Sequence, residues 1–272
     1  MTGCACGHHH HHAPAPARIE GGEGIALDRP LVALSGTLTC QDAAQMMLAL
    51  DLLPQHVSLS RAEPGNLRFD LSQQDDPMVW RLDELFADAE AFAAHQARTA
   101  ASPWGTESSA ILRDFTRTEV MPRIRPEHPQ DRTAIAALLE LAFDGEAESR
   151  LVSDLRAAGD LALSLVADVQ GSIVGHVALS PLAAEGPALA LAPLAVHPAV
   201  QARGIGAALV RAALAAMADH TVVVLGDPAY YARFGFQPVE VQSPYAGPHL
   251  LAAGPALPRG SAIAHAPAFA AL

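Results

Sequence analysis

The second half of the chain contains the clearest pattern of apolar and polar segments. Residues 188–196 are almost wholly apolar and stop before His197-Pro198, where the proline cannot donate to a β-ladder, so a strand is predicted. After the next loop, apolar side chains recur at three- and four-residue spacing, which predicts an amphipathic helix over about 206–218. These apolar residues are Ile205, Leu209, Val210, Leu214 and Met217.

Further elements are expected on both sides of this strand and helix. Gln170-Gly171 is a tight-turn signal between two apolar segments, and two helices precede them. Strands are predicted near Ile124, over 161–169, 172–179 and 221–225, and near 261–264. The second half is therefore expected to be an α+β unit.

The first half alternates between strand and helix patterns in the order β-α-β-β-α-β. A turn at residues 73–77, which ends in Asp75-Asp76-Pro77, separates its second and third strands. Strands are predicted over 31–38, 66–71, 79–86 and 111–118, with helices from about Gln41 and over 88–99. This order is that of a ferredoxin-like α/β sandwich, in which both helices cover one face of the sheet. The other face then needs a partner.

Composition divides the chain into three parts. Residues 1–30 combine a Cys/His run with Ala and Pro and cannot bury a core, so a disordered tail is predicted. A cluster of prolines between residues 101 and 130 marks a change of pattern, and we place a boundary near Val120. Domains over 31–120 and 121–272 show no internal repeat, so a fusion of unlike domains is expected.

Charge and composition exclude several classes of function. The formal net charge is −12 and both halves are acidic, so nucleic acid is not expected as a partner. All 17 basic residues are arginine, and without lysine neither a P-loop enzyme nor an ordinary pyridoxal-phosphate enzyme fits. The sequence lacks a long apolar run and a secretory signal and has 3 cysteines, so a cytoplasmic protein without membrane association is expected.

The loop Gln201-Ala202-Arg203-Gly204-Ile205-Gly206 lies between the apolar strand and the amphipathic helix. Backbone N–H groups in the first turn of a helix have no internal partner, and the two glycines let a phosphate approach them. Arg203 adds a positive charge. The spacing differs from the dinucleotide fingerprint G-x-G-x-x-G, and a plain tight turn would explain the glycines alone equally well. The position between strand and helix favours an anion site.

Residues 121–272 resemble the GNAT superfamily of acyl-CoA-dependent N-acetyltransferases. The resemblance depends on the order strand, Gln-x-x-Gly-x-Gly, helix, strand, and then Tyr230-Tyr231-Ala232-Arg233-Phe234-Gly235-Phe236. It implies a GNAT-type mixed, mostly antiparallel sheet flanked by helices, acetyl-CoA as acyl donor, and a small-molecule or peptide amine as acceptor. In this family the thioester arm lies between two strands that splay apart, here 188–196 and 221–225. The residues implied for the donor are Leu194, Ala195, Val196, Gln201, Ala202, Arg203, Gly204, Ile205, Gly206 and Ala207.

Acyl transfer from a thioester needs an oxyanion donor, a base for the amine and an acid for the leaving thiolate. Tyr231 stands at the tyrosine of the family pattern Tyr-x-x-x-Gly-Phe, which implies that it is the acid, with Tyr230 as the alternative. Packing against a short helix would also explain both rings. His176, Glu185 and His197 are candidate bases, and each also fits a structural or solvated role. The family's usual glutamate is missing from the long apolar strand, which favours a water-relayed base.

Residues 31–120 resemble the antibiotic-biosynthesis monooxygenase (ABM) family. The resemblance depends on Arg61-Ala62-Glu63-Pro64-Gly65-Asn66-Leu67-Arg68-Phe69, on Asp83-Glu84-Leu85-Phe86-Ala87-Asp88, and on Glu90-Ala91-Phe92 with His95. It implies a dimer that packs sheet on sheet; some members oxidise quinol-type aromatics without metal or flavin, and many have no known activity. The candidate pocket residues are Trp80, Glu84, Phe92, His95 and Trp104. His95 could accept a phenolic proton, although a packing role or a simple dimerisation module fits equally.

The N-terminal tail contains soft ligands next to imidazoles. They are Cys4, Cys6, His8, His9 and His10, which could bind zinc, nickel or copper without a fixed geometry, or could be the remnant of an expression tag. No metal is expected in the folded domains.

These observations predict a bidomain enzyme that moves an acetyl group from acetyl-CoA to an unidentified amine and that forms a homodimer through its ABM-like domain. One alternative is a cofactor-independent quinol or aromatic monooxygenase in the N-terminal half. The other is a non-catalytic dimer that binds acyl-CoA without turning it over.

Overall fold

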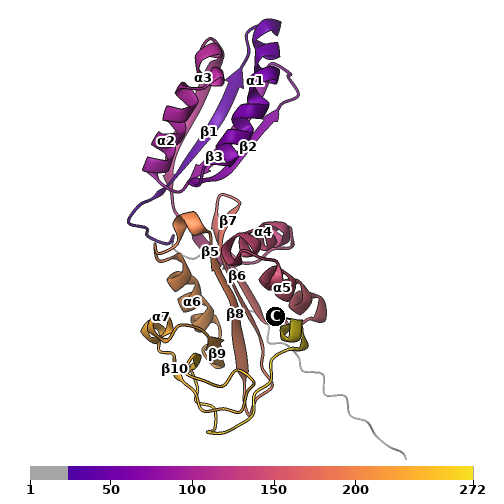
Figure 1. Ribbon diagram of the computed structural model, residues 1–272, viewed down its shortest axis with the longest axis vertical. Coiled ribbons are helices and arrows are strands. Elements are labelled where there is room, and N and C mark those ends of the chain that lie inside the picture. The colour runs from indigo at the N-terminus through magenta and orange to yellow at the C-terminus, as the bar shows by residue number, and fades with distance from the viewer. Residues whose placement is uncertain (1–23, 272) are drawn as a thin grey trace, which may run out of the picture.

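The computed structural model describes residues 24–271, which form two sheets that follow one another along the longest axis (Figure 1). The candidate tail ligands Cys4, Cys6, His8, His9 and His10 lie outside the described residues. Within the described part, no helix is long and apolar enough to cross a membrane.

The N-terminal sheet is antiparallel, with the strand order β2-β3-β1-β4. Its strands are β1 (Leu31–Thr39), β2 (Asn66–Gln73), β3 (Val79–Phe86) and β4 (Leu112–Val120), and its helices are α1 (Ala43–Arg61), α2 (Ala89–Ala100) and α3 (Pro103–Glu107). Leu53 of α1 and Trp104 of α3 pack with Leu38 of β1, and Phe92 of α2 packs against a cluster that contains Leu34 of the same strand. The helices therefore share one face, which confirms the ferredoxin-like prediction.

The C-terminal sheet has seven strands in the order β10-β11-β9-β8-β7-β6-β5, and only β8 and β9 pair in parallel. Its strands are β5 (Arg123–Pro126), β6 (Leu163–Val169), β7 (Ser172–Pro181), β8 (Ala188–Val196), β9 (Thr221–Leu225), β10 (Gln237–Pro238) and β11 (Leu250–Ala253). Its helices are α4 (Arg132–Phe143), α5 (Ala147–Ala158), α6 (Ile205–Ala216) and α7 (Pro228–Tyr231), with 3-10 turns at Pro129–Asp131, Pro198–Val200, Ala232–Phe234 and Pro267–Ala271. This is the mixed sheet that the sequence predicts.

The helices cover opposite faces of this sheet. Ile135 of α4 and Val152 of α5 pack with Val166 of β6 in one buried cluster. Leu209 and Val210 of α6 belong to a different cluster on the other face. The apolar stripe predicted downstream of the glycine loop is therefore the buried side of α6.

One predicted element is wrong. Residues 261–264 do not form a strand; only isolated bridges occur there, from Ala262 to Gln242 and from Ala264 to Ala183. Pro258 and Gly260 stand just before this segment and restrict a continuous ladder.

The two halves share a buried core. Leu31, Leu85 and Ala87 of the N-terminal half belong to the same cluster as Val169 and Val200 of the C-terminal half. Polar contacts also join the two halves: Arg68 donates to the carbonyl oxygen of Gln170 and to the hydroxyl of Ser172. The start of α6 is thus built against the N-terminal sheet.

Candidate functional site

The parallel strands β8 and β9 separate at the centre of the C-terminal sheet. They pair from Ala188 to Ala190, opposite Thr221 to Val223, and no further. A cavity of about 390 Å³ lies beyond this point, lined on these strands by residues 190–194 and 223–225. We call it the wedge cavity. Leu194, a predicted donor contact, lines it.

The glycine loop ends in an open helix start. Gly204 adopts a left-handed φ of 91° at the N-cap of α6, and no other atom lies within 4 Å of the position that a Cβ would occupy. The first helical hydrogen bond runs from the N–H of Ala208 to the carbonyl oxygen of Gly204. The preceding N–H groups therefore have no acceptor within the helix. They belong to Ile205, Gly206 and Ala207.

The other predicted donor residues support the loop in different ways. Gln201 donates from Nε2 to the carbonyl oxygen of Val196 at 3.1 Å, which ties the loop to the end of β8. Ala202 has a positive φ of 59°, so the loop turns there. The side chain of Ala195 is buried in the cluster formed with α4 and α5, and that of Ile205, the first residue of α6, is buried in the cluster that contains Leu209. Only backbone groups of these two residues could reach a ligand.

Arg203 does not face an open phosphate position. Its guanidinium donates to the carbonyl oxygen of Ala87 at 2.6 Å, to Oδ2 of Asp88 at 2.9 Å and to the carbonyl oxygen of Ala199 at 3.1 Å. The side chains of Arg203 and Asp88 are each 11% exposed. The sequence predicts that Arg203 contacts a phosphate, whereas the structure pairs its guanidinium with Asp88. This partner lies far away in the chain, so local sequence did not indicate it.

The two tyrosines stand at different sites. Tyr231 lines the wedge cavity and is 8% exposed, and burial raises its pKa to about 12. Tyr230 packs edge-on against it with ring centroids 4.9 Å apart, and its hydroxyl lies 2.9 Å from where a Cβ on Gly206 would be. Burial raises the pKa of Tyr230 as well. Tyr231 therefore borders the gap between the strands, and Tyr230 borders the start of α6.

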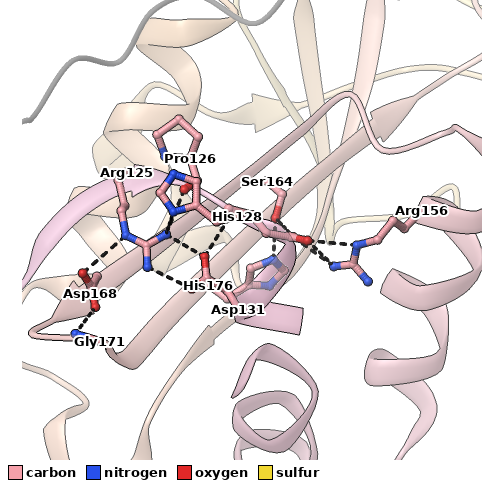
Figure 2. A network of polar contacts seen from close by, with 10 residues as sticks. Arg125, Pro126, His128, Asp131, Arg156, Ser164, Asp168, Gly171 and His176 are labelled. Atoms are coloured by element: carbon pink, nitrogen blue, oxygen red, sulfur yellow. Dashed lines mark hydrogen bonds and ion pairs between the residues drawn. The ribbon is translucent and has the colours of Figure 1, made fainter. Parts of the chain in front are cut away.

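His176 belongs to a buried polar network (Figure 2) and does not line the wedge cavity. Its Nε2 lies 2.9 Å from the hydroxyl of Ser164, which donates to Glu127 at 2.5 Å. Arg156 holds that carboxylate with two contacts of 2.9 Å. His176 is fully buried, and this burial lowers its pKa to about 4. The structure does not bring His176 together with Tyr231.

The remaining candidate bases also lie outside the wedge cavity. Glu185 is exposed in the bend between β7 and β8. His197 accepts the N–H of Ala199 at 3.3 Å through Nδ1, and burial lowers its pKa. Sequence reasoning missed the residues that do line the cavity from the helical side and the C-terminal segment: Phe143, Glu148, Leu151, Tyr245, His265 and Phe269. No motif marks them, because two helices and the C-terminal segment, which are separate in the sequence, bring them together.

The N-terminal half contains a second, smaller cavity of about 120 Å³ between its sheet and its helices. Glu84, His95 and Trp104 line it as predicted, but Trp80 and Phe92 do not. Phe92 instead packs on Phe86 with ring centroids 5.4 Å apart. Trp80 shares the face of β3 that carries Glu84 and packs against the cluster that contains Trp104, so it misses the cavity by its position along the strand and not by its face.

Titratable groups surround this cavity. Nδ1 of His95 lies 2.8 Å from Glu63, and its Nε2 lies 3.5 Å from Oε1 of Glu84. Glu84 is 1% exposed, and burial together with the charge of Glu63 raises its pKa to about 8. Burial lowers the pKa of His95, and it lowers that of His56, another lining residue, to about 3. The second oxygen of Glu84 has no hydrogen-bond partner among residues 24–271.

Among the residues that the structure describes, no group of three or more His, Cys, Asp or Glu side chains could hold a metal ion. Cys40, the cysteine in the described part, is buried, and burial raises the pKa of its thiol.

The lowered pKa of His176 predicts a pH-dependent stability. An unfolded histidine titrates near pH 6.5, so below that pH the unfolded state takes up a proton that buried His176 does not. Its contribution is therefore complete above pH 6.5 and is lost, by about 3 kcal/mol, as the pH falls to about 4. Urea unfolding at pH 7.5 and pH 5.0 should show a smaller loss in His176→Gln than in wild type. The exposed His249→Gln is the control; equal losses in all three proteins would contradict the assignment.

Comparisons with known proteins agree with both halves of the structure. The model of the acetyltransferase (GNAT) domain matches residues 160–238, and that of the antibiotic biosynthesis monooxygenase family matches residues 42–104. A GNAT family acetyltransferase from Brucella melitensis, solved in complex with acetyl-CoA, is 37% identical to this chain, with a TM-score of 0.48. The match covers 54% of this chain and 96% of that protein.

Two relatives from Escherichia coli (strain K12) are similar over the C-terminal half. The uncharacterized N-acetyltransferase YhbS is 44% identical over 121 residues, which are 42% of this chain and 72% of that protein. The uncharacterized N-acetyltransferase YjhQ is 35% identical over 135 residues, which are 45% of this chain and 75% of that protein. The chain belongs to the GNAT family of N-acetyltransferases, with an ABM domain before the acyltransferase domain.

Proposed function

We propose that this N-acetyltransferase transfers an acetyl group from acetyl-CoA to an amine in the wedge cavity. The observation that supports this most directly is the position of Tyr231 on a cavity formed where β8 leaves β9. A phenol with its pKa raised by burial is protonated at neutral pH, so it is available as a proton donor. The open start of α6 stands on the face of the sheet where Tyr231 packs.

The residues that would hold the donor are mostly backbone groups. The N–H groups of Ile205, Gly206 and Ala207 would receive the pyrophosphate at the positive end of α6. Gln201 holds this loop against the end of β8. Leu194 and Val196 lie at that end, and their backbone groups would form hydrogen bonds with the thioester arm. Arg203 would not contact the donor directly; its ion pair with Asp88 holds the loop in position.

The chemical step requires a proton to leave the amine and another to reach the sulfur. The amine nitrogen attacks the thioester carbonyl, and the carbon–sulfur bond breaks as the thiolate takes a proton from the hydroxyl of Tyr231. A neutral backbone N–H would stabilise the oxygen of the attacked carbonyl. Because His176, Glu185 and His197 all lie outside the cavity, we assign removal of the amine proton to water rather than to one of these side chains.

The organisation of the chain follows the two sheets. We propose a tail over 1–30, an ABM-like domain over 31–120 and an acyltransferase domain over 121–272, since β4 ends at Val120 and β5 of the next sheet begins at Arg123. The prediction of disorder is wrong for the end of this tail, because Leu27 is buried in the shared core and Ile25 donates to the carbonyl oxygen of Pro122. The resemblance of the N-terminal half also supports a homodimer through the part of its sheet face that the shared core around Leu31 and Leu85 does not cover, and the composition supports a cytoplasmic location.

Replacing Tyr231 by phenylalanine removes the proposed acid without changing the packing of the ring. We expect kcat to fall by roughly 100-fold, since general acid catalysis contributes at least that much, with the Kd for acetyl-CoA within about twofold. Thiol release and calorimetric titration measure the two quantities. In the matched variant Tyr230→Phe kcat should change little. An unchanged kcat in Tyr231→Phe, or a loss confined to Tyr230→Phe, would refute the assignment, and binding without any thiol release would favour an acyl-CoA sensor.

Replacing Gly204 by glutamate puts a negative side chain into the open loop. We expect acetyl-CoA to bind at least about tenfold more weakly, because the carboxylate occupies the anion position and repels phosphate. Gly159→Glu is the control: that glycine caps α5 with a φ of 78°, close to the 91° of Gly204, so both variants incur similar backbone strain. Calorimetry that gives the same Kd for both variants would place the phosphates elsewhere.

The N-terminal cavity supports a second candidate function, a cofactor-independent oxidation of a single-ring quinol. Its volume of about 120 Å³ suits one benzene-sized ring. Nδ1 of His95 donates to Glu63, so in the neutral ring Nε2 is the acceptor; a phenol would donate to it in place of the hydroxyl of Thr99, which lies 3.4 Å away. Oxygen would be the oxidant: one atom would enter the ring and the other would leave as water with two of the quinol's hydrogens, which converts hydroquinone to hydroxyquinone.

An oxygen electrode tests this candidate with hydroquinone as substrate. We expect oxygen uptake by the full chain to fall at least about 100-fold in His95→Ala, which removes the proposed base. Trp80→Phe should keep it, because Trp80 does not line the cavity. No enzyme-dependent uptake, or uptake unaffected by His95→Ala, would leave the N-terminal half without this activity.

A further inference from the structure

We propose that the acceptor of the transferase is a compact monoamine with an apolar, ring-sized body, bound at the α5 side of the wedge cavity with Glu148 against its ammonium group. This inference deepens the proposed function and rests on it for the acyl donor. It concerns the half of the cavity that neither the cofactor loop nor the family pattern describes.

The wedge cavity passes from one face of the sheet to the other. On the α6 face, Tyr231 belongs to the cluster that contains Leu209, and Leu194 packs against this cluster. On the opposite face, Leu151 and Phe269 belong to a different cluster. All four of Leu194, Tyr231, Leu151 and Phe269 line the same cavity. Since the open start of α6 belongs to the first face, the second face is where an acceptor can enter.

Aromatic side chains form the wall on this second face. Tyr245 packs edge-on against His265 with ring centroids 5.1 Å apart, and His265 lies 4.9 Å from the ring of Phe269. Phe143, at the end of α4, lines the cavity too and is 41% exposed. Burial lowers the pKa of His265, so this wall is uncharged at neutral pH. Such a wall favours an aromatic or aliphatic body over a polar one.

Glu148 is the single acidic side chain among the described residues that line the cavity, and no arginine lines it. It lies in the first turn of α5, and no ion pair or hydrogen bond joins its carboxylate to another residue between 24 and 271. A carboxylate without a partner at the mouth of an apolar cavity suits one cation. A polyamine or an aminoglycoside would need several carboxylates, and an acceptor with its own carboxylate or phosphate would find no positive partner.

The volume limits the acceptor as well. The cavity measures about 390 Å³ and must hold the acyl end of the donor together with the acceptor's amine. A single ring on a short chain fits in the remaining space, whereas an oligosaccharide or a folded peptide does not.

Binding and turnover of phenethylamine by the full chain test the proposal. We expect phenethylamine to be acetylated with a kcat/KM at least about tenfold above that of spermidine or glycine. Glu148→Gln should raise the KM for phenethylamine roughly tenfold, the usual value of a hydrogen bond to a charged group, while kcat stays within about twofold. Asp154→Asn is the control, because this acidic residue lies exposed on the same helix. Tyr245→Ala should raise the same KM by removing part of the apolar wall.

Two titrations separate the outcomes. Calorimetry with acetyl-CoA alone tests the proposed function, and calorimetry with phenethylamine, with and without CoA, tests the acceptor site. Acetyl-CoA binding without phenethylamine binding, or a preference for spermidine or glycine, would overturn the acceptor class and leave the acyltransferase intact. Phenethylamine binding that Glu148→Gln weakens, in a protein that does not bind acetyl-CoA, would keep the amine site and reject the transfer reaction. Identical amine binding by wild type and Glu148→Gln would overturn the role of Glu148.

Discussion

The separation of β8 from β9 is the constraint on which the chemistry of the C-terminal half depends. Beyond Ala190 the two strands no longer exchange hydrogen bonds, although both remain inside the sheet. Backbone N–H and C=O groups at an internal strand edge need partners, and a cavity there lets an extended polar ligand provide them. Apolar side chains on β8 are then no obstacle, because the ligand would contact the backbone. Tyr231, the proposed proton donor, lines the same cavity.

Arg203 connects this site to the N-terminal half. Its guanidinium contacts Ala87 and Asp88, and Asp88 in turn caps α2 by accepting the N–H of Ala91. That N–H lowers the pKa of Asp88, and the charge of Arg203 lowers it further. One acidic side chain therefore fixes both the start of α2 and the loop before α6. The ABM domain thus contacts the acyltransferase loop, and the two halves also pack together in the shared core around Leu85.

Local patterns predicted what depends on local sequence. The bounds of β8 and β9 agree with the predicted 188–196 and 221–225, because Pro198 and the apolar runs define them. The placement of Arg203 could not be predicted, since its partner Asp88 is 115 residues away. Trp80 was assigned to a pocket from its type; it lies on the same face of β3 as Glu84, but the sequence does not show where along the strand the cavity ends. Glu148 went unnoticed, because only the packing of α5 against the C-terminal segment gives it a role.

The carboxyl groups of the two cavities differ in burial and in their neighbours, and this difference limits what each cavity can bind. Glu84 is 1% exposed beside the charged Glu63, so its pKa rises to about 8 and the group is mostly protonated at neutral pH. A protonated carboxyl can donate to a phenol or quinone oxygen but offers little attraction to a cation. Glu148 stands at a surface opening with no partner among the described residues, so a cation can approach it. Neutral ring substrates therefore suit the N-terminal cavity, and ammonium groups suit the wedge cavity.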